Sequence, residues 1–292
     1  MPTSITASSS QMLGTIQVPL DGVDNVAQAS VSPGYQGILN NTYYLAKSLC
    51  YQRPHVSMSW TTTTSLTVNS FSGVWVSATT PAEQFVYLQS SVPIVATTTN
   101  LEGGGTFANS TLYYVYVYGT GLPASPQIQI STTAPDAFLS FKNADESKRY
   151  LGHFVTDGSA HIVPFTMIDY EYFMSPPLQL LNVALMAGGT TVTNDIQAPT
   201  PFPASIKEYG LKMDVDTTET TVCWIYTAPK GVTPVAGVSE YDFFKDGTLV
   251  NFNSFFCPVA AGVAGKVTVS VNTPAPITGV INADIRMISY KE

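Results

Sequence analysis

Residues 110–119 read STLYYVYVYG and hold four tyrosines and two valines but no charged side chain. Because alternate residues of a β-strand face opposite sides, this run predicts a strand with two apolar faces. The two faces are a tyrosine face (Leu112, Tyr114, Tyr116, Tyr118) and a valine face (Tyr113, Val115, Val117). We predict a central strand whose valine face packs on the core of its own domain. Its tyrosine face is expected to meet another layer, which a second sheet, a neighbouring subunit or a ligand could provide.

Strand-like segments with turn residues between them lie on both sides of this run. Alternating apolar and polar residues, interrupted by turns about every 8–12 positions, are typical of a β-sandwich or barrel. The segments are SLTVNS (65–70), GVWVSA (73–78) and EQFVYLQS (83–90) before it, and PQIQIS (126–131), RYLGHFVT (149–156) and AHIVPFTM (160–167) after it. Asp157–Gly158 predicts a hairpin between the last two, because Asp-Gly suits a turn that needs a positive φ.

A second block of strands follows Pro176–Pro177, which we interpret as a stiff connector. In this block Asp246–Gly247 predicts another hairpin. The stretch 188–204, rich in Gly, Thr and Pro, predicts a loop or a segment that reaches a neighbouring subunit. At the other end of the chain, residues 1–34 predict an extended arm. The apolar residues of 37–52 recur at helical spacing and predict a helix.

The predicted fold class is therefore all-β and mainly antiparallel. We expect two β-sandwich or barrel-like domains, preceded by an extended N-terminal arm and one short helix. The expected limits are 1–34 for the N-terminal arm or anchor, 35–175 for the first β domain and 176–292 for a C-terminal β-sandwich domain.

Charge is scarce in this chain. Its 292 residues carry a formal net charge of −8, and charged residues make up only 11%. This balance argues against free nucleic acid and anionic membranes as partners, because phosphate neutralisation needs clustered Lys and Arg. A surface made of Ser, Thr, Asn and Gln is common in extracellular and virion β proteins. A Thr-rich β protein that is soluble by itself has the same composition, so composition leaves both open.

Residues that could carry enzymatic chemistry do not form a recognisable motif. EGGGT (102–106) lacks the Lys of a phosphate-binding loop, so we expect an ordinary loop. DVDTTE (214–219) lacks the Gly and the distal Glu of a calcium-binding loop, so we expect a solvated acidic turn. No nucleophile elbow is present. We therefore predict no enzymatic activity, no catalytic residue and no cofactor.

Cysteine and histidine are also few. Cys50, Cys223 and Cys257 are odd in number and form no C-x-x-C motif, which indicates isolated thiols rather than a disulfide framework. His153 and His161 flank the first predicted hairpin turn and could bind a metal across it, but ordinary surface histidines are far commoner and we expect no metal. The N-terminus lacks the basic start of a secretory signal, and no apolar run reaches the length of a membrane span.

Four sequence elements follow one another in the span 110–165. They are YYVYVY (113–118), STTAP (131–135), KRYLG (148–152) and IVPF (162–165). In this order they resemble a module found in structural proteins of tailed bacteriophages and prophages, often tail-fibre, head-fibre or related exterior proteins. The likeness extends upstream to about residue 60. It departs from the usual RRYLG element in having Lys148 in the first position.

The resemblance implies a non-enzymatic structural protein on the exterior of a tailed-bacteriophage virion, such as a fibre, spike or adaptor, made and folded in the bacterial cytoplasm. It also implies a homotrimer whose N-terminal arm binds other virion proteins of the capsid or tail, with a bacterial surface glycan as a further partner. Two alternatives stay open: a head fibre or capsid decoration (cement) protein, and a carbohydrate-binding module. A depolymerase ranks last, because no short β-helix repeat is visible.

The candidate interface or structural residues lie in the first and third of these elements. They are Tyr114, Tyr116, Tyr118, Arg149 and Tyr150. Arg149 ends the charge-dense stretch 142–149, where it could pair with Asp145 or Glu146 or stack on a tyrosine of a neighbouring strand. The plainer interpretation of that stretch is a solvated polar loop.

Overall fold

A computed structural model describes most of the chain. The described residues are 3–6, 15–18, 54–77, 85–120, 125–199, 201–217, 224–229, 251–258 and 266–292. Within them the secondary structure consists of strands, one 3-10 turn (η1, Thr98–Asn100) and no α-helix, and the strand ladders are antiparallel. The prediction of an all-β, mainly antiparallel fold is confirmed. The predicted helix at 37–52 and the Asp246–Gly247 hairpin lie outside the described residues. Of the arm, β1 (Thr3–Thr6) and β2 (Thr15–Val18) are described and pair with each other.

The chain divides into two compact units whose sequences interleave. Unit 1 comprises Met1–Val56, Thr64–Phe107 and Tyr113–Phe154, and unit 2 comprises Ser57–Thr63, Ala108–Leu112 and Val155–Glu292. The domain limits proposed from the sequence stay a prediction.

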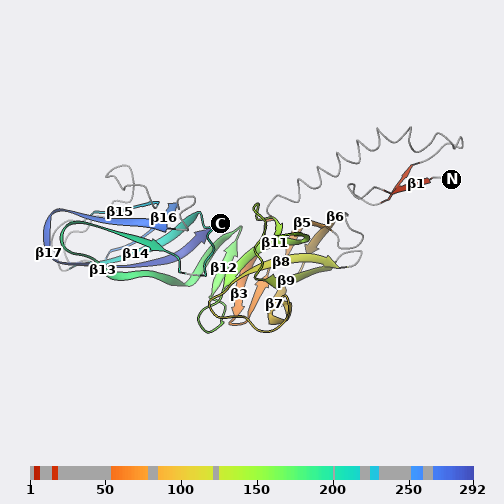
Figure 1. Ribbon diagram of the computed structural model, residues 1–292, viewed down its shortest axis with the longest axis horizontal. Helices are drawn as coiled ribbons and strands as arrows, with labels where there is room; N and C mark the ends of the chain where they lie inside the picture. The colour runs from red at the N-terminus through yellow and green to blue at the C-terminus, as the bar shows by residue number, and fades with distance from the viewer. Residues whose placement is uncertain are drawn as a thin grey trace. The chain divides into compact units, whose positions relative to one another are not determined.

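Besides the β1–β2 pair, the described part of unit 1 contains three groups of paired strands. They are β4 (Ser65–Val68) with β7 (Ile94–Thr97), β5 (Phe71–Ser77) with β6 (Phe85–Ser90), and a four-stranded sheet in the order β10 (Phe141–Lys142), β11 (Asp145–Val155), β8 (Leu112–Thr120), β9 (Ser125–Ser131). The opening stretch STLYYVYVYG is therefore an inner strand, β8, with a neighbour on each side (Figure 1). This confirms its predicted central position in a sheet.

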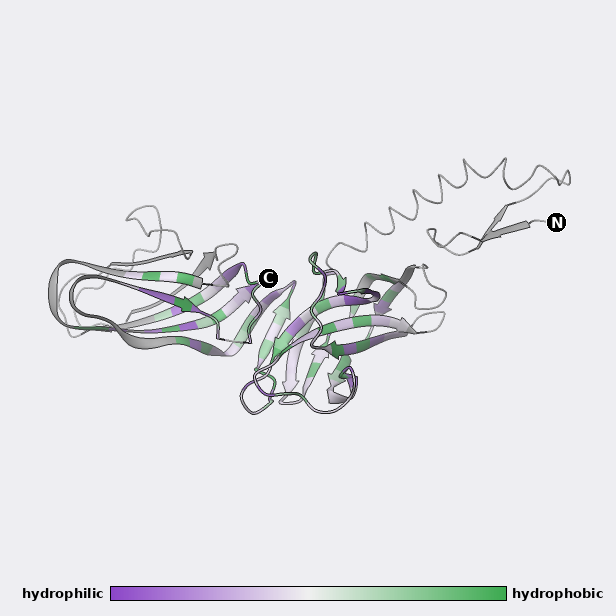
Figure 2. Cartoon of the chain, viewed as in Figure 1, coloured by the Kyte–Doolittle hydropathy of each residue, from purple (hydrophilic) through white to green (hydrophobic). Residues whose placement is uncertain are grey.

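The valine face of β8 belongs to the core of unit 1. Tyr113, Val115 and Val117 are all buried. The Tyr113 ring stacks on Phe154 with 5.3 Å between centroids, and Phe107 packs against both rings. Along the strands, green apolar bands alternate with paler polar ones, as the period of two requires (Figure 2).

Unit 2 is built on two long strands. β13 (Glu171–Gln197) and β17 (Lys266–Lys291) have 27 and 26 residues, whereas strands usually have about 3–10. They pair from Glu171 opposite Lys291 to Gln197 opposite Lys266, with five register shifts. On the far side of β13 from β17 lie β12 (Phe165–Ile168) and then β3 (Ser57–Thr62). On the far side of β17 lie β14 (Glu208–Thr217) and then β16 (Asn251–Pro258). A further strand, β15 (Trp224–Pro229), also pairs with β17.

Three predictions for this part of the chain are wrong. Pro176 and Pro177 are not a connector but lie inside β13, where the register shifts between Phe173 and Leu178. Proline lacks a backbone N–H and fits a strand at such an irregularity. Of the expected loop at 188–204, the part as far as Gln197 is strand, and only the described residues after it lie outside strands. Of the expected acidic turn at 214–219, the part as far as Thr217 is strand, and residues 218–219 lie outside the described residues. In each case cross-strand pairing outweighs the local preference of Gly, Pro or Asp.

A row of tyrosines crosses the inner face of unit 2. Tyr172, Tyr290 and Tyr209 lie opposite one another on β13, β17 and β14, and all three are buried. The rings of Tyr172 and Tyr290 stack with 4.7 Å between centroids and an interplanar angle of 4°, and Phe202 meets Tyr290 edge-on at 5.6 Å. Burial, with Glu292 and Tyr209 nearby, raises the pKa of Tyr290 well above its ordinary value. The stacked rings of Tyr172 and Tyr290 form an apolar contact between β13 and β17.

The predicted turn at Asp157–Gly158 is present, but for a different reason. The Asp157 carboxylate accepts hydrogen bonds from the backbone N–H groups of Ser159 and His161 at 2.8 and 2.9 Å, and a bridge between Thr156 and Ile162 closes the loop. The positive φ belongs to Ala160, at 63°. The Asp157 side chain therefore shapes this turn, rather than a left-handed glycine.

Candidate functional site

The five candidate residues lie on two neighbouring strands of unit 1. Tyr114, Tyr116 and Tyr118 are on β8, and Arg149 and Tyr150 are on β11. The Tyr150 ring is the centre of the group, because the rings of Tyr114 and Tyr116 lie 6.2 and 5.9 Å from it between centroids. Tilted and edge-on rings at these separations attract one another. The structure thus brings the first and third sequence elements into one aromatic cluster.

Tyr116 is the most enclosed member of the tyrosine face. Its side chain is 0% exposed, and its hydroxyl donates a hydrogen bond of 2.7 Å to the backbone carbonyl of Thr133. Thr133 belongs to the STTAP element. A buried phenol needs such a partner, since an unsatisfied hydroxyl would be costly. Tyr116 therefore joins the second element to the first and the third.

Tyr114 and Tyr118 flank Tyr116 and are only half-buried. The Lys148 ammonium lies 3.5 Å from the centroid of the Tyr118 ring, a cation–π contact. Burial lowers the pKa of Lys148, while nearby Asp145 acts in the opposite direction. The tyrosine face is therefore closed at its centre and open to further contacts at Tyr114 and Tyr118.

Arg149 is buried rather than solvated. Its side chain is 1% exposed, and its guanidinium carbon lies 4.9 Å from the centroid of Phe141, the residue opposite it on β10. The interpretation of 142–149 as a solvated polar loop is therefore wrong: Lys142 and residues 145–149 are strand, and Lys142 and Arg149 are both buried. The stacking partner is a phenylalanine of the neighbouring strand, not the expected tyrosine. A desolvated cation over an aromatic face is worth about 2 kcal/mol.

An irregularity of β11 at Gly152 was not predicted from the sequence. Tyr150 contacts the tyrosine face of β8, whereas Phe154 contacts Tyr113 on the valine face. Strict alternation would put both on one side, so the side-chain pattern of β11 shifts by one residue between them. Gly152 has a φ of 156°, which residues with a side chain rarely adopt. The shift also brings His153 to Tyr150, whose hydroxyl lies 3.0 Å from His153 Nδ1.

A second feature missed from the sequence is the link between Glu102 and Lys142. The Lys142 ammonium bonds the Glu102 carboxylate, which also accepts a hydrogen bond of 2.5 Å from the Ser131 hydroxyl. The Lys142 side chain is 10% exposed and that of Glu102 is 41% exposed. The contact attaches the loop at 102–106, called the glycine loop below, to β9 and β10. Its three glycines, 103–105, all have positive φ. The loop expected at 102–106 is confirmed, but its anchor was not foreseen.

This link makes the stability of the protein depend on pH in the acidic range. Lys142 and then Ser131 hold the pKa of Glu102 below its ordinary value of 4.5. A carboxyl with a depressed folded pKa contributes stability above its unfolded pKa and loses it as the pH falls through the folded pKa. The free energy of unfolding should therefore decline below pH 4.5. Urea denaturation at stepped pH should show a shallower decline for Glu102→Gln, which cannot titrate there. Equal slopes would contradict this role of Glu102.

The histidines do not come together as a metal site. His153 is buried beside Tyr150, whereas His161 is an exposed residue of the Asp157 turn, with its Nδ1 3.8 Å from the Asp157 carboxylate. Over the described ranges, no group of three or more His, Cys, Asp or Glu side chains is placed to hold a metal ion. Over the same ranges, no helix has the length and apolar character needed to cross a membrane.

No known family model matches the chain, and no curated protein matches it in sequence. Solved structures that it resembles include the insecticidal delta-endotoxin Cry8Ea1 of Bacillus thuringiensis, at 11% identity, a TM-score of 0.26 and coverage of 85% of this chain and 55% of that one. A tryptic core variant of Cry1Da from Bacillus thuringiensis matches at 12% identity, with a TM-score of 0.19 and coverage of 85% and 54%. The chain thus spans just over half the length of each of these two toxin structures. TM-scores this low do not assign a fold or a function.

Proposed function

We propose that this protein is a non-enzymatic structural component of the exterior of a tailed-bacteriophage virion, as a fibre, spike or adaptor. The proposal rests on the likeness of the span 60–167 to a module of such proteins. It places the mature protein in the virion, after synthesis and folding in the cytoplasm of the bacterial host.

The observation that carries the proposal is the way three elements of the likeness meet at one residue. Tyr116 belongs to the first element, its hydroxyl bonds Thr133 of the second, and its ring packs on Tyr150 of the third. Segments that match a module only by chance have no reason to converge in one buried cluster. Their convergence supports the interpretation that these three elements belong to one folded module, whereas the fourth, IVPF (162–165), lies in unit 2.

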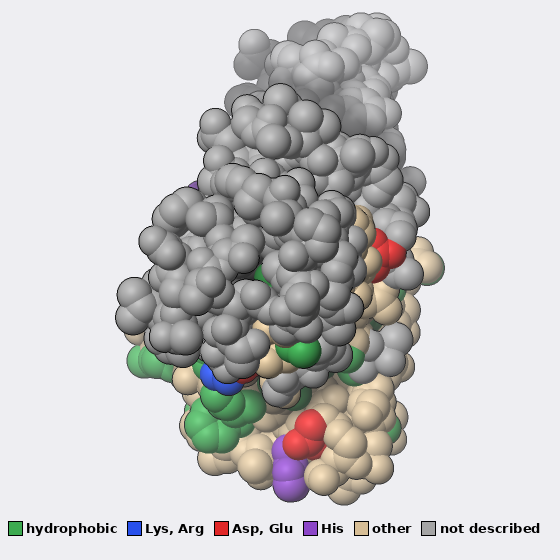
Figure 3. Space-filling view, turned by 90° about the vertical axis from the view of Figure 1, so that its left-hand side faces the viewer, with side chains coloured by type: hydrophobic (Ala, Val, Ile, Leu, Met, Phe, Trp, Pro, Cys, Tyr) green, Lys and Arg blue, Asp and Glu red, His purple; other side chains and the backbone are tan. Residues whose placement is uncertain are grey.

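The remaining surface supports a role in assembly. Tyr114 and Tyr118 leave partly exposed rings on either side of Tyr116. In Figure 3 the described surface is mostly tan, with few coloured charged groups, in keeping with a charged fraction of 11%. Aromatic side chains are enriched where subunits meet, and Lys, Glu and Asp are depleted there. We propose a homotrimer that uses Tyr114 and Tyr118 as part of its interface.

Within this proposal, the arm of residues 1–34 binds a capsid or tail protein, and the β units face outward toward the host surface. A head fibre or capsid decoration protein is the nearest alternative, and it shares the arm and the exterior position. The two differ in where a gold label on the chain is found on particles: over the tail or over the head.

Deletion of residues 1–34 separates anchoring from folding. The truncated protein should keep the strand signature of the full chain in far-ultraviolet circular dichroism and remain a trimer in light scattering. It should no longer be incorporated into phage particles, as measured by immunoblotting of purified virions. The full-length chain with Tyr116→Phe, which keeps the ring, is the matched control and should be incorporated normally. Normal incorporation of the truncated chain would refute the anchor, and a full-length monomer would refute the trimer.

A further inference from the structure

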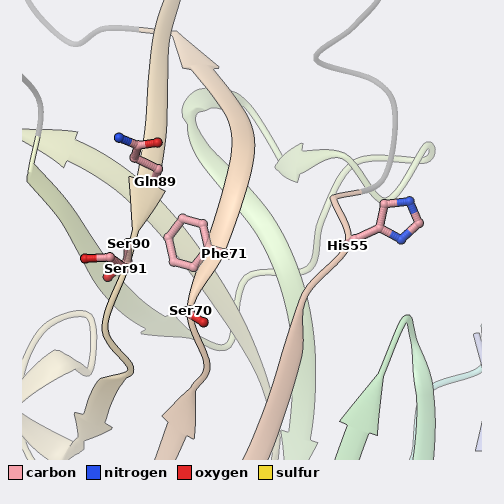
Figure 4. A pocket seen from close by; sticks show the side chains of 6 residues that line it. All are labelled: His55, Ser70, Phe71, Gln89, Ser90 and Ser91. Carbon is pink, nitrogen blue, oxygen red and sulfur yellow. The ribbon is translucent and has the colours of Figure 1, made fainter.

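A polar hollow lies on unit 1 beside β5 and β6. Its volume is about 550 Å³, and it is lined by His55, Ser70, Phe71, Gln89, Ser90 and Ser91 (Figure 4). Sites for small ligands usually measure about 300–1,000 Å³. The hollow is separate from the tyrosine cluster, with which it shares no lining residue.

The lining of the hollow is mostly polar, and Phe71 is its one apolar side chain. Phe71 is 5% exposed and lies opposite Ser90 in the pairing of β5 with β6. The Ser90 hydroxyl donates a hydrogen bond of 2.6 Å to the Val92 carbonyl, which fixes its orientation. The other polar residues of the lining are exposed. In Figure 4, Gln89 and Ser91 lie on one side of the Phe71 ring, and His55 lies on the other with its ring turned outward.

An exposed aromatic ring adjoins this lining. Tyr87 precedes Gln89 by two residues on β6, so both side chains leave the same face of the strand, about 7 Å apart. The Tyr87 side chain is 45% exposed. Its ring offers a flat apolar surface with a hydroxyl at the edge, next to the amide of Gln89 and the hydroxyl of Ser91.

The segments that line the hollow contain no Lys, Arg, Asp or Glu. They are 54–77 and 85–101, which supply every lining residue. Hydroxyl and amide groups both donate and accept hydrogen bonds without favouring an ion of either sign. A ligand with many neutral hydroxyls and one apolar ring face matches this combination, whereas a phosphate, sulfate or carboxylate finds no Lys or Arg among the lining residues.

We propose that the hollow and Tyr87 together form a binding site for a neutral carbohydrate. The apolar face of one sugar ring packs on Tyr87, and its hydroxyls exchange hydrogen bonds with Gln89, Ser91 and Ser70. The inference goes beyond the virion role and does not depend on it, because binding is a property of the purified chain.

The test is a glycan array of neutral oligosaccharides printed beside their sialylated and sulfated counterparts. The full-length chain should bind neutral glycans in preference to the acidic ones. Isothermal titration with the strongest neutral ligand should then show a loss of roughly tenfold in affinity for Tyr87→Ala, and a similar loss for Gln89→Ala. Both side chains are exposed, so circular dichroism and the melting temperature should match the unmodified protein.

Phe138→Ala is the matched control, because Phe138 is an exposed aromatic of the same unit, 72% exposed, that does not line the hollow. It should bind as the unmodified chain does. The proposal is overturned if no neutral glycan binds at millimolar concentration, if acidic glycans bind better, or if either test variant retains its affinity within about twofold. Self-association that Tyr87→Ala abolishes, without glycan binding, would assign the hollow to a second copy of the chain and also overturn it. Absence of the protein from virions would leave these measurements unaffected.

Discussion

Tyr116→Ala is expected to lower the free energy of unfolding of unit 1 by about 3–5 kcal/mol, the range for removing a large aromatic side chain from a core. The Tyr116 ring is 0% exposed and packs on Tyr150, and its loss leaves a cavity between two strands. It also leaves the Thr133 carbonyl without its phenol partner. Urea denaturation followed by near-ultraviolet circular dichroism measures the change.

Tyr116→Phe separates the ring from the hydroxyl. Phenylalanine preserves the packing and removes only the hydrogen bond to Thr133, so the expected loss is about 1 kcal/mol. A loss of less than 1 kcal/mol for the alanine variant would show that Tyr116 is not part of the core. Loss of host binding with folding and assembly intact would instead make the tyrosine face a recognition surface.

The second large effect is expected in unit 2. Tyr290→Ala removes the ring between Tyr172 and Phe202. β17 then loses the side chain that it places between its neighbours β13 and β14. We expect a loss of about 3–5 kcal/mol in the transition that involves unit 2, measured by urea denaturation. Partial proteolysis should then give earlier cleavage within β13 and β17.

Phe173→Ala provides the comparison for Tyr290→Ala. Phe173 neighbours Tyr172 on β13, but its side chain is 41% exposed and leaves the opposite face of the strand. Its replacement should change the free energy of unfolding by roughly 0.5 kcal/mol or less. If Phe173→Ala proved as damaging as Tyr290→Ala, the exposed face of β13 would have to be buried in an assembly.

Local alternation was sufficient to predict the strands around the opening stretch. β8 and β9 follow the period of two, and their buried positions, such as Val115, Val117, Ile128 and Ile130, are those that the pattern indicates. Such positions depend only on the chain near them, which is why sequence alone identifies them. The turn at Asp157 was located in the same way, although its geometry was not.

The length of β13 and β17 could not be predicted in that way. Pro176, Pro177 and the glycines at 188 and 189 are strand breakers when judged alone, and they divided β13 into a connector, a strand and a loop. The structure accommodates them at register shifts, which only the pairing with β17 reveals. A strand of this length is determined by its partner, which begins 69 residues after β13 ends (266 − 197 = 69).

The candidate site was predicted in part. The tyrosines of β8 and Tyr150 were named from their own segments, and the structure brings them together. The burial of Arg149 depends on Phe141, and the anchor of the glycine loop joins Glu102 to Lys142 across 40 positions. Contacts of this kind have no signature in a single sequence, because neither partner is unusual within its own segment.

The irregularity at Gly152 has a consequence for how unit 1 holds together. On one side of it β11 supplies Tyr150 to the tyrosine cluster, and on the other it supplies Phe154 to the rings of Tyr113 and Phe107. A single strand, β11, thus contributes buried aromatic side chains to both faces of its own sheet. Because Tyr150 and Phe154 are only four residues apart, a substitution that destabilises the packing on one face should also destabilise the other. The two faces should therefore unfold in a single thermal transition.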